Sequence, residues 1–189
     1  MRKLIPLVAA LLVVTAAPAS AATHRVDRCA RYGGDTLRHT ALVRVYQSGD
    51  AHACWKPTGS RIFLWVEDEY DTGGVRAIRG AFVAYDLQSY PTCKADCPPG
   101  VTGTSDTKVV NVRTRRRRDL GVLATRLVLA NSGAVAWLEG SSGSYRLWLW
   151  DRHGRRQLDT GDIAPRSLKL SGHFVRWTSA GQAKSARFH

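Results

Sequence analysis

Apolar and polar residues alternate in short runs along most of the chain, and no segment beyond residue 22 has the spacing of an amphipathic helix. Two such runs are Leu127-Val128-Leu129 and the stretch from Tyr145 to Trp150. Gly, Ser, Asp and Asn, the residues that favour turns, separate the runs. The pattern predicts an all-β fold of short strands joined by tight turns.

One strand pattern occurs three times. A small or apolar residue and a valine precede an aromatic residue by fixed steps in 82–85, 134–137 and 174–177. Self-similarity of this kind indicates a repeated structural unit, and we expect each aromatic residue to pack between sheets. Trp148 and Trp150 share one face of another strand, where they form either a sugar-stacking platform or, as we favour, part of a buried surface.

A second repeated element places a polar turn between two apolar ends at constant separation. Its copies run from Tyr46 to Cys54, from Val112 to Leu120 and from Trp150 to Leu158. Each is predicted to be a β-hairpin. With a short strand before each aromatic strand, these elements define a four-stranded unit, and residues 125–164 are its most complete copy.

A four-stranded unit of about 40 residues has the period of a β-propeller blade. On these repeats, residues 37–189 resemble the β-propeller superfamily, and more narrowly the small, Arg-rich, propeller-like secreted proteins of bacteria. The resemblance implies about three four-stranded antiparallel repeats, with residues 40–59 and 166–189 each supplying part of a unit. It implies no particular activity, because one fold hosts many functions.

Three units are fewer than the four blades with which an ordinary propeller closes. Strands from the two ends of the chain could join to complete a third blade and close a compact domain. The alternatives are an open array with exposed edges and a homodimer of six blades. Exposed edges favour the homodimer, because unpaired strands recruit partners.

The first 21 residues have the organisation of a secretory signal peptide. Arg2 and Lys3 precede an apolar stretch from Leu4 to Val14, and Ala19-Ser20-Ala21 supplies the small residues of a cleavage site. The apolar stretch is too short to span a membrane, and no later segment reaches the required length. We expect removal of residues 1–21, a single domain over residues 22–189, no membrane span, and a location outside the cell or in its envelope.

All four cysteines lie beyond the predicted cleavage site, in a compartment that favours disulfides. Pairing of Cys93 with Cys97 closes a short loop and leaves Cys29 to pair with Cys54. The competing interpretation is a zinc site, but the spacings match no common zinc pattern. The Cys93–Cys97 loop belongs to an insert, residues 88–107, and insertions of this kind usually lie on the surface and carry function.

The chain is strongly basic, with 28 Lys and Arg residues, 15 Asp and Glu residues and a formal net charge of +13. Such a balance attracts polyanions, although an Arg-rich surface can also be simply solvated. The densest run, Arg115, Arg116, Arg117 and Arg118, falls in a predicted hairpin turn and is the candidate binding element, because guanidinium groups bind phosphate and sulfate bidentately. The alternative is a charged turn that discourages edge pairing. No aromatic residues interleave with the run, which argues against specific nucleic-acid binding.

The dense group of carboxylates is Glu67, Asp68, Glu69 and Asp71. It is either a calcium-binding loop, the source of a carboxylate pair for glycoside hydrolysis, or a solvated loop, and we favour the last. The histidines are scattered, no nucleophile elbow is present, and no Gly-rich phosphate loop precedes a helix. The sequence therefore indicates no cofactor, no metal site and no catalytic residue.

Repeats, disulfides and basic charge together favour a secreted, non-catalytic interaction or scaffold module. Its expected partner is an anionic envelope polymer or a protein outside the cell. The alternative is a secreted hydrolase of glycans or peptides that uses the loop-borne acidic residues 67–71. The sequence favours the module because every catalytic signature is missing.

Overall fold

The computed structural model describes residues 27–90 and 103–189. In these segments 15 strands form four antiparallel sheets, and the one helical element is a 3-10 turn, η1 (Pro165–Ser167). The all-β prediction is confirmed, and no helix within these segments is long and apolar enough to cross a membrane. The predicted signal peptide and the predicted Cys93–Cys97 disulfide lie outside the described residues.

Each of the first three sheets is a meander of four strands that are consecutive in sequence. Sheet 1 consists of β1 (Asp35–His39), β2 (Val43–Ser48), β3 (Asp50–Trp55) and β4 (Ser60–Trp65). Sheet 2 consists of β5 (Asp71–Arg79), β6 (Phe82–Ser89), β7 (Thr104–Asn111) and β8 (Arg117–Asp119). Sheet 3 consists of β9 (Arg126–Leu129), β10 (Val135–Glu139), β11 (Tyr145–Asp151) and β12 (Gly154–Gly161).

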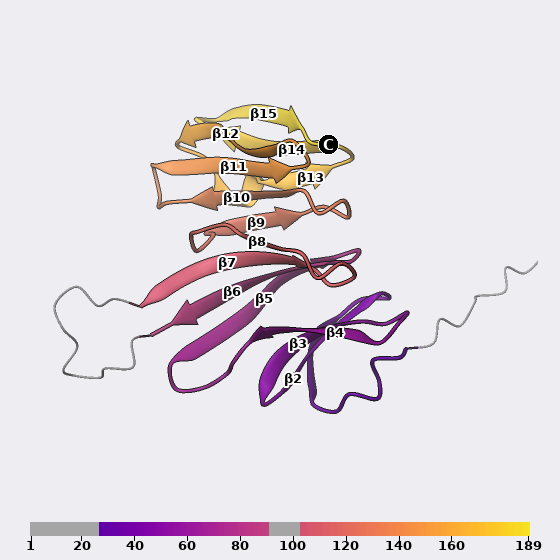
Figure 1. Cartoon of the computed structure of the whole chain (residues 1–189). Coiled ribbons are helices and arrows are strands. Elements are labelled where there is room, and N and C mark those ends of the chain that lie inside the picture. Colours follow the sequence, from indigo (N-terminus) through magenta and orange to yellow (C-terminus); the bar gives the residue numbers. More distant parts are fainter. Residues whose placement is uncertain (1–26, 91–102) are drawn as a thin grey trace, which may run out of the picture.

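Sheet 4 has three strands, β13 (Lys169–Ser171), β14 (Phe174–Ser179) and β15 (Gln182–Arg187). The first strands of successive sheets are in contact, β1 with β5, β5 with β9 and β9 with β13. We call these four strands the inner strands. Figure 1 shows the sheets stacked in chain order, with sheet 1 and sheet 4 at opposite ends of an open array. The arrangement is compatible with propeller-like blades.

The two ends of the chain do not join into one sheet, because β1 pairs with β2 in sheet 1 and β15 pairs with β14 in sheet 4. Of the three alternatives, a third blade completed by strands from both ends is therefore not formed by the described residues. The described chain contains three four-stranded sheets and a separate three-stranded one. The sequence pattern did not identify β1 as the first strand of sheet 1, because β1 is exposed at every position and has no apolar alternation.

The recurring aromatic strand is the second strand of its sheet, in β6, β10 and β14. In each copy the valine and the aromatic residue face the preceding sheet, as Val83 and Tyr85 do in the core between sheets 1 and 2. The intervening residue faces the following sheet, as Ala84 does. Tyr85, Trp137 and Trp177 are at most 5% exposed, which confirms their predicted packing between sheets.

In sheet 1 the corresponding aromatic residue is Tyr46, whose face has no preceding sheet. Residues 27–34 cover it instead, with the Tyr32 ring stacked at 5.9 Å between centroids. The predicted Cys29–Cys54 disulfide is confirmed and packs against Tyr46 in the same cluster. The disulfide thus holds an N-terminal cover on the first sheet.

All three predicted hairpins exist, but they are not equivalent copies. Tyr46–Cys54 spans the turn between the second and third strands of sheet 1. Val112–Leu120 and Trp150–Leu158 instead span the turns between the third and fourth strands of sheets 2 and 3. A polar turn between apolar ends identifies any hairpin, so the pattern alone does not locate it within its sheet.

Candidate anion-binding groove

An open groove of about 630 Å³ lies where β5, β9 and β13 meet. Side chains of β9 alternate between the two neighbouring cores, so Leu127 packs toward sheet 2 and Val128 toward sheet 4. Together with Ala77 and Leu170 they form a half-buried aliphatic floor. The floor exists because β9, an edge strand of sheet 3, packs against a neighbouring sheet on each face while one backbone edge remains open.

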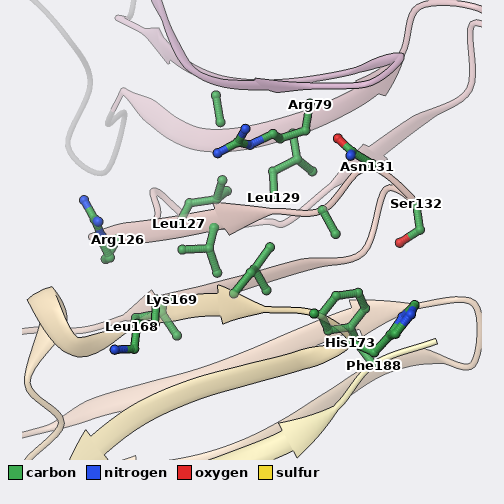
Figure 2. Close-up of a pocket in the computed structure, with 15 residues that line it drawn as sticks. Arg79, Arg126, Leu127, Leu129, Asn131, Ser132, Leu168, Lys169, His173 and Phe188 are labelled. Atoms are coloured by element: carbon green, nitrogen blue, oxygen red, sulfur yellow. The ribbon is translucent and has the colours of Figure 1, made fainter. Parts of the chain in front are cut away.

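Basic side chains surround this floor. Arg79 ends β5, Arg126 begins β9, Lys169 begins β13, and His173 lies in the following turn. All four are exposed. Figure 2 shows Arg79 between β5 and β9, Arg126 and Lys169 toward one end of the groove, and His173 toward the other end. We call this site the cationic groove.

No described residue neutralises the charge of the cationic groove. None of the described residues that line it is Asp or Glu. Arg79, Arg126 and Lys169 form no side-chain hydrogen bond or ion pair with any described residue. A concave surface lined by one sign of charge concentrates counter-ions, so this groove attracts anions.

Arg76, three residues before Arg79, has a different role. Its guanidinium lies 3.4 Å from Asp86 and donates a 2.8 Å hydrogen bond to the carbonyl oxygen of Ala124. It therefore ties β5 to the start of sheet 3. Arg76 is exposed like Arg79 but is occupied by these contacts, so exposure alone does not make a basic residue near the inner strands available to a ligand.

The predicted Arg115–Arg118 element connects sheets. Arg115 donates to the Ser60 hydroxyl at 3.3 Å, and Arg117 donates to the Phe63 carbonyl oxygen, both in β4. Arg118 donates to the Gly133 carbonyl oxygen at 3.0 Å, and its guanidinium lies 5.4 Å from the Trp150 ring centroid. Arg116 is exposed. Ligand binding by this run stays a prediction, and its arginines lie outside the linings of the cationic groove and its neighbouring hollow.

Trp148 and Trp150 pack between sheets 2 and 3, as favoured above. The Trp148 ring stacks on Trp137 with 6.3 Å between centroids. The Arg155 guanidinium lies 4.3 Å from the Trp148 centroid and 5.2 Å from that of Trp137. Trp137 and Arg155 thus both contact the Trp148 ring, which supports a packing role rather than an open sugar-stacking platform.

The acidic stretch 67–71 forms the connection into β5. Glu67 accepts a 2.7 Å hydrogen bond from the Trp65 indole, and Asp68 accepts hydrogen bonds from the backbone N–H groups of Tyr70 and Asp71. Within the described part of the chain, no group of three or more His, Cys, Asp or Glu side chains is placed to hold a metal ion. The geometry of the stretch is that of a turn.

The sequence pattern did not reveal a polar cluster on sheet 2. Lys108 lies 3.3 Å from Asp106 and 3.0 Å from Asp119. Burial raises the pKa of Asp106, and the charge of Asp119 adds to this effect. Burial would also raise the pKa of Asp119, but hydrogen bonds from Gly121 and Lys108 lower it. One lysine is thus shared by two carboxylates, and the cluster lines neither hollow on the inner strands.

Comparison with protein-family models and with curated proteins found no match. The geometry of the chain itself therefore indicates its function. Arg79, Arg126 and Lys169 carry no sequence signal, because each is a single basic residue at the end of a different strand. Only the contacts between inner strands bring them together.

Proposed function

We propose that this protein is a secreted, non-catalytic binding module of propeller-like architecture that takes an anionic polymer in the cationic groove. The observation that carries the proposal is the set Arg79, Arg126 and Lys169 around one groove, with no carboxylate among its described lining residues. The net charge of +13 adds long-range attraction. The Cys29–Cys54 disulfide supports an oxidising location, outside the cell or in its envelope.

The test is retention on immobilised heparin as a general polyanion. A triple variant, Arg79→Gln/Arg126→Gln/Lys169→Gln, is expected to elute at clearly lower salt than the wild type. Loss of three phosphate or sulfate contacts should lower affinity at low salt on the order of tenfold or more, and should flatten its salt dependence.

The matched control is Arg28→Gln/Arg113→Gln/Arg152→Gln, which removes the same charge from exposed positions outside the groove. Equal shifts in both triple variants would mean that only net charge matters, and would reject the groove as the site. A further variant, Arg115→Gln/Arg116→Gln, addresses the predicted hairpin element. A larger shift there than in the groove variant would move the site to the hairpin.

A further inference from the structure

A second hollow adjoins the cationic groove. It has a volume of about 350 Å³, and its lining includes Arg38 and His39 of β1 together with Arg79 of β5. Ala77 and Arg79 line both hollows. The two hollows therefore adjoin at β5, and together they extend from β1 to β13; we call the pair the inner track.

The inner track presents one available permanent cation on each sheet. These are Arg38, Arg79, Arg126 and Lys169, on sheets 1 to 4 in that order. Arg38 donates one hydrogen bond, to the carbonyl oxygen of Arg76 at 2.8 Å. Because a guanidinium has five N–H donors, Arg38 keeps donors for a ligand. A row of single cations suits a chain of repeating negative charges better than one compact anion.

The side chains that line the inner track also restrict which kind of polymer backbone can bind there. Phe188 is the one Phe, Tyr or Trp among the described lining residues of the two hollows, and it is only 5% exposed. Nucleic-acid bases need exposed aromatic faces for stacking. The half-buried Leu127, Val128 and Leu170 instead offer aliphatic contact to the CH groups of an acyclic backbone.

We infer that the ligand of the inner track is a linear phosphodiester polymer with a polyol backbone, long enough to occupy both hollows. Guanidinium groups bind phosphate oxygens bidentately, and Lys169 adds a point charge. The polymer crosses the inner strands, and phosphates along it meet cations of successive sheets. This inference rests on the proposed anion-binding function and names its substrate class and its path.

The experiment measures fluorescence anisotropy with labelled poly(glycerol phosphate) of two lengths, a short oligomer that fills one hollow and a long one that spans both. Arg38→Gln is expected to weaken binding of the long polymer by roughly threefold to tenfold at low salt and to leave the short oligomer unaffected. The salt slope for the long polymer should fall by about one. Arg38→Lys should weaken binding less than Arg38→Gln, because it keeps the charge but loses the bidentate contact, and Arg113→Gln should have no effect.

Unchanged binding of the long polymer to Arg38→Gln, with weakened binding to the groove triple variant, would overturn the track and leave the proposed function standing. If neither Arg38→Gln nor the groove triple variant weakens binding, both the inner track and the proposed function are overturned. A single-stranded oligodeoxynucleotide or a sulfated glycan of equal charge serves as the competing polymer. If either binds as tightly as poly(glycerol phosphate), the polyol-phosphate class is wrong.

Discussion

Asp151 is the one charged side chain that is buried within the described residues, at 2% exposure. Its two carboxylate oxygens accept hydrogen bonds from the two terminal nitrogens of Arg156, each at 3.0 Å. Backbone N–H groups of His153 and His189 complete the shell at 2.9 and 3.2 Å. A buried carboxylate is tolerated when it is fully paired in this way, and this one fastens the end of the chain to sheet 3.

Replacing Asp151 tests this pairing through acid stability. Burial would raise the pKa of Asp151, but the hydrogen bonds of Arg156 and the backbone outweigh it and lower the pKa to about 2. The unfolded carboxyl binds protons near its usual value of 3.8, so the stabilisation is present above about pH 4 and is lost as pH falls toward 2. Asp151→Asn should therefore lower the free energy of unfolding at neutral pH by about 2 kcal/mol.

Urea unfolding at neutral pH and at several acidic pH values checks this prediction. The difference between Asp151→Asn and wild type should shrink steadily below pH 4, where the wild type loses the same interaction. Asp162→Asn, at an exposed position, is the control and should change stability by less than about 0.5 kcal/mol. A difference that persists undiminished at the acid end would contradict the linkage.

At the scale of elements, close packing of β4 on β5 depends on one glycine. A Cβ atom at Gly73 would overlap the indole ring of Trp65, whereas a Cβ atom at the adjacent Gly74 would meet nothing within 4 Å. Trp65 is 2% exposed and stacks on Tyr85 with 5.6 Å between ring centroids. The missing side chain at Gly73 therefore allows the indole ring to lie against the strand.

The neighbouring glycines give a matched pair of variants. Gly73→Ala should destabilise the protein by roughly 1–3 kcal/mol, because the indole ring must move out of a well-packed core. Gly74→Ala should be neutral or slightly stabilising, since it lowers the entropy of the unfolded chain without a clash. Chemical denaturation followed by tryptophan fluorescence measures both. Equal effects of the two substitutions would show that Trp65 does not pack on Gly73.

The Cys29–Cys54 disulfide fixes the N-terminal cover of sheet 1. The two cysteines are 25 residues apart in sequence, so the bond removes considerable entropy from the unfolded chain. The double variant Cys29→Ser/Cys54→Ser should lose about 3 kcal/mol of stability. It should also give faster hydrogen exchange at Tyr46 and its neighbours in β2. Unchanged exchange in β2, despite lower global stability, would mean that the cover stays in place without the bond.

At the scale of the whole molecule, an open array must protect the outer faces of its first and last sheets. Sheet 1 is covered by residues 27–34. In sheet 4, Arg176 occupies the position at which sheets 2 and 3 have Ala84 and Ala136, and it is exposed. A charge therefore stands where the inner sheets have a small buried residue, and this discourages stacking of another sheet.

Removal of this charge should promote self-association. Wild-type protein is expected to be a monomer by light scattering at micromolar concentration. Arg176→Leu should dimerise or aggregate, because the new leucine and the 42% exposed Phe174 together form an apolar patch. Arg152→Leu, in an exposed turn, is the control. A wild-type dimer would instead support pairing through strand edges, as the sequence suggested. A monomeric Arg176→Leu variant would show that the charge does not protect this face.

Much of the local structure follows from the sequence, but the site does not. The aromatic strands and the hairpin turns were predicted correctly, because each depends on residues close in sequence or on a repeated alternation. The Cys29–Cys54 pair was also predicted correctly, because few pairings are open to four cysteines. The Arg115–Arg118 run was the predicted binding element because its charges are adjacent in sequence. The structure commits Arg115, Arg117 and Arg118 to neighbouring sheets and leaves the isolated Arg79 and Arg126 beside a groove.

The sequence by itself determined that this protein is a basic, all-β repeat chain, because side-chain alternation and turn residues act over a few positions. Only the tertiary structure decided that the described strands form four sheets, that β1 and β15 remain in separate sheets, and that cations of separate sheets line adjoining hollows. The physical reason is that docking of one sheet on the next brings together strand ends that lie tens of residues apart. A pattern that spans only a few residues cannot show which distant strand ends will come together.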